Sequence, residues 1–219
     1  MSQLPVPAEL APDLKRVDQI IAERTTARPV VAGIAGPHLG AGAGRWRAVV
    51  ALLAARLGAY APERAAHAAA AVELIYAAAR VHDSLVDEAA RRRGQMAAQA
   101  HWGSSAALMV GDYLFALAAA EMALAPDPRV IAAYSRSVMA ICEGQLAPVT
   151  SVVPLDVARN QYLYRAGRID AALFEAAARA GAACSELAPE QADALGRFGY
   201  DLGLALRIAA DARDYEGPG

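Results

Sequence analysis

Lysine is almost absent from this chain of 219 residues, because Lys15 is the only lysine among 21 basic side chains. The 23 acidic residues bring the formal net charge to −2. Nucleic-acid-binding domains usually carry a basic face or stripe, which this balance does not favour. The abundant arginines instead suit bidentate contacts to phosphate oxygens.

Cysteine is also scarce, with Cys142 and Cys184 far apart in apolar helical patterns. We expect reduced thiols packed in a core, and therefore no disulfide framework. The amino terminus lacks the charged start and apolar run of a signal peptide. The longest apolar stretch, Ala106 to Ala120, is shorter than the ~20 residues that cross a bilayer. The sequence therefore predicts a cytoplasmic chain with no transmembrane segment.

Alanine and leucine dominate, hydrophobic residues make up 56% of the chain, and β-branched runs are few. This composition favours helices almost throughout. We expect the chain to break at Pro29, Gly33, Gly36 and Pro37, and at later proline-containing loops. The predicted helices are Pro12 to Thr25, Arg45 to Leu57, Pro62 to Ala90, Ser104 to Ala123, Asp127 to Leu146, Pro154 to Arg165, Arg168 to Gly181 and Pro189 to Tyr215. The fold class that follows is an all-α, single-domain helical bundle spanning residues 1–219.

The predicted helix Pro62 to Ala90 ends in a cluster of charged residues that includes Asp83 and Asp87. Residues four apart lie on one helical face, so these two carboxylates would stand side by side. Magnesium favours such a pair when a phosphate supplies further oxygens. The alternative is a solvated helix end in which Asp87 pairs with Arg91.

A glycine-rich turn, Gly40 to Gly44, leads into a helix that carries Arg45 and Arg47. Backbone amides at the start of a helix attract anions, and nearby arginines would strengthen a phosphate site. The alternative is an ordinary loop.

Together these segments resemble the trans-isoprenyl diphosphate synthases, the polyprenyl synthetase family. The first aspartate-rich region of that family is similar to His82-Asp83-Ser84-Leu85-Val86-Asp87 followed by Arg92-Arg93-Gly94. Its second aspartate-rich helix is similar to Leu202 to Tyr215, and further landmarks lie at Gly111-Asp112 and Glu143-Gly144-Gln145. The resemblance implies the isoprenoid synthase fold, with a central apolar cavity.

The resemblance also implies roles for particular residues. Catalysis and magnesium binding would fall to four aspartates, Asp83, Asp87, Asp211 and Asp214. Allylic and isopentenyl diphosphate would be bound by Arg45, Arg47, Arg92 and Arg93. Ala78 and Ala79, just before the first motif, would leave room for a long prenyl tail. Equally, these two alanines would simply let helices approach closely.

Several positions depart from the family pattern. One aspartate is missing from each motif, at Ser84 and Ala210, and Arg207 stands where the family has glutamine. Lysines are replaced by Gly44 and Ile169, and Gln95 and Gln99 occupy two further phosphate-contacting positions, those of a lysine and a histidine. Arg207 would pair with Asp211 and leave that carboxylate less free to hold a metal. The magnesium site is therefore expected to be weakened.

The motifs and their departures from the family pattern leave three candidate functions. The favoured one is a weak or non-catalytic, regulatory subunit of a heteromeric prenyl diphosphate synthase, paired with a full-length homologue. The chain ends at Gly219, where the resemblance implies several further helices that help to enclose the pocket and exclude water. The alternative is a self-sufficient prenyltransferase, or a related diphosphate-ionising enzyme, that works alone or as a homodimer with a reduced magnesium site. A helical protein with no prenyl role is the third.

Overall fold

The computed structural model describes residues 6–40, 44–86, 104–125, 127–148 and 152–216. These residues form helices and no strand, so the all-α class is confirmed. The first elements are η1 (Ala8–Leu10), α1 (Ala11–Thr25), α2 (Pro29–Leu39), α3 (Trp46–Ala55) and α4 (Pro62–Val86). They are followed by α7 (Ser104–Ala123), α8 (Pro128–Leu146), α9 (Leu155–Ala166), η2 (Gly167–Ala171), α10 (Ala172–Cys184) and α11 (Pro189–Glu216).

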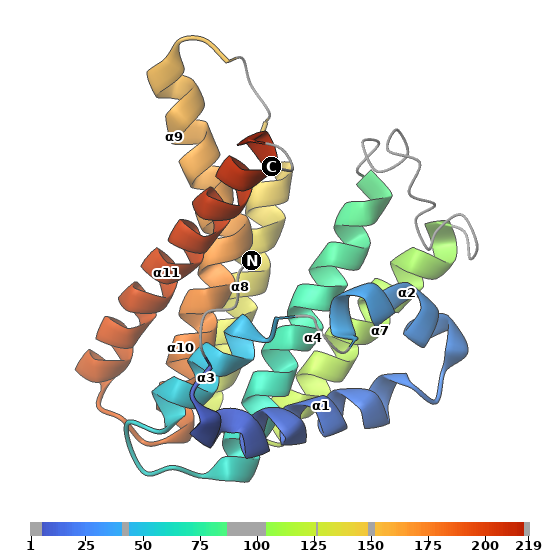
Figure 1. The fold of residues 1–219 in the computed structure, drawn as a ribbon, viewed down its shortest axis with the longest axis vertical. Helices are drawn as coiled ribbons and strands as arrows, with labels where there is room; N and C mark the ends of the chain where they lie inside the picture. The colour runs from blue at the N-terminus through green and yellow to red at the C-terminus, as the bar shows by residue number, and fades with distance from the viewer. Residues whose placement is uncertain (1–5, 41–43, 87–103, 126, 149–151, 217–219) are drawn as a thin grey trace.

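Helix α4 is the central element of the bundle. Most of its side chains from Ala65 to Ala78 have almost no exposed surface, Glu73 included. A helix that is apolar on nearly every side has to be covered on every side. Helices α1, α2, α3, α7, α8 and α10 all contact it. In Figure 1, α8, α10 and α11 stand on one side of α4 and α7 on the other, while α1 crosses beneath.

Helix α2 was not expected, because Pro29 and Pro37 were predicted to break the chain. That prediction is wrong. Pro29 occupies the first turn of the helix, where its missing N–H is not needed. Val31, Ile34, Ala35 and Leu39 are buried, so the packing of this face outweighs the cost of Pro37 and the glycines inside the helix.

A π-helical turn, η2, joins α9 to α10 without a break. The sequence predicts two separate helices there. A π turn adds one residue per turn, which rotates the side chains that follow it. Asp170 lies in this turn.

Helix α7 is the one described helix that is long and apolar enough to cross a membrane, by length and composition alone. The core helix of a folded domain meets the same criterion. The Glu121 side chain near the end of α7 has no exposed surface and pairs with Arg24 of α1 and His67 of α4, both at 2.7 Å. These pairs tie α7 into the bundle.

The two cysteines differ in environment. Cys184 is buried, as expected, but Cys142 is exposed on α8, so the prediction of two core thiols is wrong for Cys142. Cys142 lies on the side of α8 opposite its buried face, a distinction that the apolar pattern around it did not reveal. Both thiols are free.

Candidate functional site

The carboxyl-terminal ends of α4 and α11 lie at the same end of the molecule (Figure 1). Four charged side chains from α4, η2 and α11 interact there, and we call them the acidic layer: Asp83, Asp170, Arg207 and Asp211. Asp83 of the first acidic motif and Asp211 of the second therefore lie at the same end of the bundle.

Asp83 is half-buried on α4 and is held from two sides. Its Oδ2 accepts a hydrogen bond from Arg80 Nη1 at 3.0 Å, and its Oδ1 accepts one from the side-chain amide of Gln145 on α8. Burial raises the pKa of Asp83 above its ordinary value, and the charge of Asp170 adds to this rise while Arg80 opposes it. The Asp83 carboxylate is therefore already engaged by donors from its own chain.

Asp211 is engaged in the same way. Its Oδ2 accepts hydrogen bonds from Arg207 Nε and from the Tyr162 hydroxyl, both at 2.8 Å. Burial, together with the hydrogen bond to Asp211, raises the pKa of Tyr162 to about 12. The predicted pairing of Arg207 with Asp211 is thus confirmed.

Arg207 has a second carboxylate partner that the sequence did not indicate. Its Nη1 lies 3.2 Å from Asp170 Oδ2. Burial acts to lower the pKa of Arg207, but Asp170 and Asp211 together raise it above its ordinary value. One guanidinium therefore joins η2 to α11 through two acids.

The remaining predicted aspartates are not part of this layer. Asp214 is exposed near the end of α11, and no hydrogen bond or ion pair joins it to another described residue. Asp87, Arg92 and Arg93 lie outside the described residues. Of the four aspartates predicted to act together, the structure places Asp83 and Asp211 in the acidic layer.

The two predicted phosphate-binding arginines of the first half of the chain are turned inward. Arg45 Nε lies 2.9 Å from Asp18 Oδ1, and its Nη2 donates to the Leu39 carbonyl at 2.6 Å. Arg47 is buried, with its guanidinium carbon 3.6 Å from the ring centre of Tyr76 and 4.8 Å from that of Phe174. Buried N–H groups of both side chains, Arg45 Nη1 and Arg47 Nε, have no partner among the described residues. Their assignment to a diphosphate stays a prediction.

Ala78 and Ala79 differ in exposure. Ala78 has no exposed surface, whereas Ala79 is partly buried against the core. Burial of Ala78 fits the interpretation that small residues let helices approach closely. A long prenyl tunnel at these positions stays a prediction.

Two family-like landmarks position the neighbours of Asp83. A Cβ on Gly111 of α7 would lie 2.1 Å from His82 Nε2, so a larger residue there would force the His82 ring beside the first motif to move. A Cβ on Gly144 of α8 would lie 2.8 Å from side-chain atoms of Arg168 and Ile169 in η2. This contact sets the adjoining Gln145 where it reaches Asp83.

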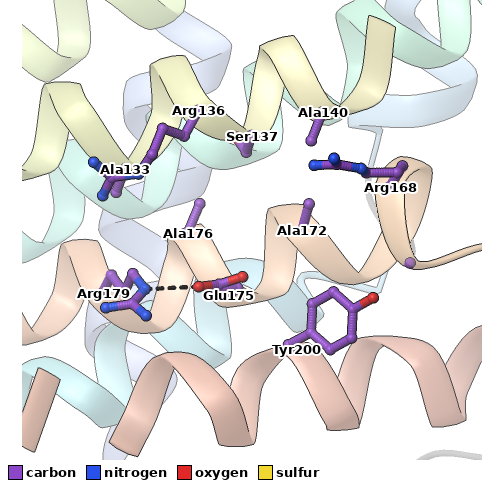
Figure 2. A pocket seen from close by; sticks show the side chains of 11 residues that line it. Ala133, Arg136, Ser137, Ala140, Arg168, Ala172, Glu175, Ala176, Arg179 and Tyr200 are labelled. Atoms are coloured by element: carbon purple, nitrogen blue, oxygen red, sulfur yellow. Dashed lines mark hydrogen bonds and ion pairs between the residues drawn. The ribbon is translucent and has the colours of Figure 1, made fainter. Parts of the chain in front are cut away.

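Arg168 lies one residue before Ile169, the position where the family pattern has a lysine. It lines a cavity of about 260 Å³ between α8, α10 and α11, together with Arg136, Arg179 and Tyr200 (Figure 2). Its Nη2 pairs with Glu143 at 3.1 Å.

Of the four aspartates predicted to bind magnesium, Asp83 and Asp211 lie in the acidic layer, Asp214 does not, and Asp87 lies outside the described residues, so the magnesium site stays a prediction. Across the part of the chain that the structure describes, no group of three or more histidine, cysteine, aspartate or glutamate side chains is placed to hold a metal ion. Asp83 and Asp211, the two predicted ligands of the layer, already accept hydrogen bonds from arginines.

Sequence reasoning missed Tyr162 and Asp170, which bond to residues of the acidic layer, and it did not single out the buried Glu73. Glu73 is fully buried on α4, where its Oε1 accepts the Ala48 N–H at 2.9 Å. An acid in the middle of an alanine-rich apolar run was a usable signal for Glu73. Asp170 and Tyr162 gave none, because the π turn that brings α9 and η2 beside α11 has no sequence signature.

Comparison with known proteins places this geometry in context. The family model described as polyprenyl synthetase matches residues 29–218. The chain is 34% identical over 209 residues to heptaprenyl diphosphate synthase component 2 of Geobacillus stearothermophilus, covering 95% of this chain and 65% of that protein. It is 31% identical over 210 residues to octaprenyl diphosphate synthase of Escherichia coli, with the same two coverages.

Solved structures agree. A decaprenyl diphosphate synthase from Rhodobacter capsulatus superposes with a TM-score of 0.84 at 33% identity, covering 94% of this chain and 64% of that one. A polyprenyl synthase from Caulobacter crescentus superposes with a TM-score of 0.85 at 32% identity, covering 96% and 64%. The chain thus spans about two thirds of the length of these relatives.

Proposed function

The chain belongs to the polyprenyl synthetase family, and from this membership we propose that it serves prenyl diphosphate synthesis as a weak or non-catalytic, regulatory subunit. Its partner would be a longer member of the family that carries intact aspartate-rich motifs. The substrates of the assembly would be an allylic diphosphate and isopentenyl diphosphate.

The observation that carries this proposal is the internal pairing of the acidic layer. Asp83 is bonded to Arg80, and Asp211 is bonded to Arg207. In the reaction of the family, carboxylates act by holding cations that stabilise the charge of the departing diphosphate. A carboxylate whose charge is already balanced by a neighbouring arginine contributes less to that task.

The names of the relatives support an assembly. Two matched relatives, from Geobacillus stearothermophilus and Bacillus subtilis, are each named component 2 of a heptaprenyl diphosphate synthase. The Caulobacter crescentus structure is a complex with calcium and isoprenyl diphosphate, which supports the substrate class.

In such an assembly these side chains would have a structural role, because they join helices at one end of the bundle. Arg207 joins η2 to α11, and Gln145 joins α8 to α4 through Asp83. These bonds fix four elements around the end of the bundle, so the chain would present a constant surface to its partner and would influence the rate or product length from outside the reacting centre.

The purified chain tests the proposal directly. We expect incorporation of labelled isopentenyl diphosphate, with an allylic diphosphate and magnesium present, to be at least about a hundredfold slower than with a longer family member, the cost of one lost preorganised contact. The variants Asp83→Ala and Asp211→Ala should not change this background. Vigorous activity that disappears in Asp83→Ala would defeat the subunit proposal.

That outcome would favour the second candidate, a self-sufficient prenyltransferase that uses the surviving aspartates. The similarity to octaprenyl diphosphate synthase of Escherichia coli, whose name mentions no component, is the observation in its favour. In that case Asp83→Ala and Asp211→Ala should both remove activity, while Asp214→Ala reports whether the exposed carboxylate contributes.

A further inference from the structure

Arg207 occupies the place between two acids from different elements. Its Nε is 2.8 Å from Asp211 Oδ2 on α11, and its Nη1 is 3.2 Å from Asp170 Oδ2 in η2. The Asp170 side chain is 16% exposed and the Asp211 side chain 32%. These two carboxylates are thus partly buried, and both bond to the Arg207 guanidinium.

A divalent cation at this point would need the same carboxylate oxygens. Magnesium and calcium bind carboxylate oxygens at about 2.0–2.6 Å, with further ligands arranged around the ion. The guanidinium is planar and rigid, and it already takes up one oxygen of each acid. A cation bridging the two acids would compete with Arg207 for Asp170 Oδ2 and Asp211 Oδ2 and would be repelled by the guanidinium charge.

The balance of charges in the acidic layer also indicates that Arg207 opposes cation binding. The described acids Asp83, Asp170 and Asp211 face two arginines, Arg80 and Arg207. Removing Arg207 would leave Asp170 and Asp211 without a positive partner among these residues, and the charge of Asp170 also acts on Asp83. Like charges at close range attract a cation more strongly once their internal counter-ion is gone.

We propose that Arg207 is a fixed internal counter-ion that closes the second acidic motif to divalent cations, and that its removal opens a cation site at Asp170 and Asp211. This inference rests on the proposed function only in treating the acidic layer as the site. It adds a specific cause for the low activity expected of the isolated chain.

Binding of Mn²⁺ to the isolated chain, followed by calorimetry and by paramagnetic broadening of NMR signals, tests this proposal. Arg207→Gln and Arg207→Met should bind Mn²⁺ at least about tenfold more tightly than the wild type, since losing one close opposite charge shifts affinity on that scale. Arg207→Lys, which keeps the charge, should gain less. Arg213→Gln removes an exposed arginine from the same helix and should gain nothing.

The site is located by a second substitution. In the background of Arg207→Gln, either Asp170→Asn or Asp211→Asn should remove the gained affinity. An unchanged affinity in Arg207→Gln, or a gain that survives both asparagine substitutions, would overturn the proposal. Broadening of the Asp170 and Asp211 signals in the wild type would overturn it without any variant, whether or not the variants fold.

This experiment does not depend on turnover. The two proposals fail on different readouts: vigorous turnover by the isolated chain would end the subunit proposal, and Mn²⁺ binding at Asp170 and Asp211 in the wild type would end the role proposed for Arg207.

Discussion

At the scale of single residues, several charged side chains are buried, among them Glu73, Arg47 and Glu121. Glu73 is the clearest case, because it lies in the fully buried stretch of α4, where its carboxylate accepts the Ala48 N–H. Burial raises the pKa of Glu73, and the charge of Arg47 offsets only part of that rise.

This shift predicts a pH dependence of stability. The folded pKa of Glu73 is above the unfolded one, so the folded state holds the proton more tightly than the unfolded state. The resulting stability is present below the ordinary pKa and is lost as the pH rises through the raised value. Glu73→Gln stays neutral and keeps an oxygen for the Ala48 N–H. Urea unfolding between pH 4 and pH 8 should therefore show the wild type losing free energy of unfolding relative to Glu73→Gln, and parallel profiles would contradict this.

The sequence identified part of the site at this scale. The resemblance of the two aspartate-rich motifs implied that Asp83 and Asp211 belong to one site, and the placement of Arg207 and Asp211 on one helical face predicted their pairing. The bond between Arg207 and Asp170 could not be predicted, because it depends on how η2 lies against α11. The inward turn of Arg45 and Arg47 depends likewise on contacts with Asp18, Tyr76 and Phe174.

At the scale of elements, the long helices were predicted from the composition and from the proline and glycine residues between them. Ser104–Ala123 has the predicted bounds, and α8 and α11 begin or end within a residue of prediction. The errors came where packing overrides local preference, as in α2, or where a π turn replaces a loop, as in η2. Both elements contribute contacts to α4 or α11, so tertiary packing decided them.

Glu121 gives a test of how α7 is held. Its carboxylate is fully buried and joins α7 to Arg24 and His67. We expect Glu121→Gln to lower the free energy of unfolding by about 2 kcal/mol, since a buried acid loses charged partners but Arg24 remains partly in water. The control is Asp112→Asn, which changes an exposed acid on the same helix and should cost no more than about 0.5 kcal/mol. Equal effects in urea unfolding would mean that the buried pairs do not tie α7 to the bundle.

At the scale of the whole molecule, the chain has the fold of its family, with the acidic layer at the end of the bundle where α4 and α11 finish. The fold class came directly from the alanine-rich helical pattern and the ordered landmarks. The carboxylates of this layer are paired with arginines of the same chain. We therefore propose that the layer stabilises this chain within an assembly whose partner carries out the reaction.

A mixed assembly with a longer family member measures this claim most directly. Incorporation of labelled isopentenyl diphosphate would be compared in two complexes, one with the aspartate-rich motifs of the partner removed and one with Asp83→Ala and Asp211→Ala in this chain. The account predicts that activity disappears in the first complex and is retained in the second. Activity that survives removal of the partner's motifs and vanishes with Asp83→Ala and Asp211→Ala would contradict it.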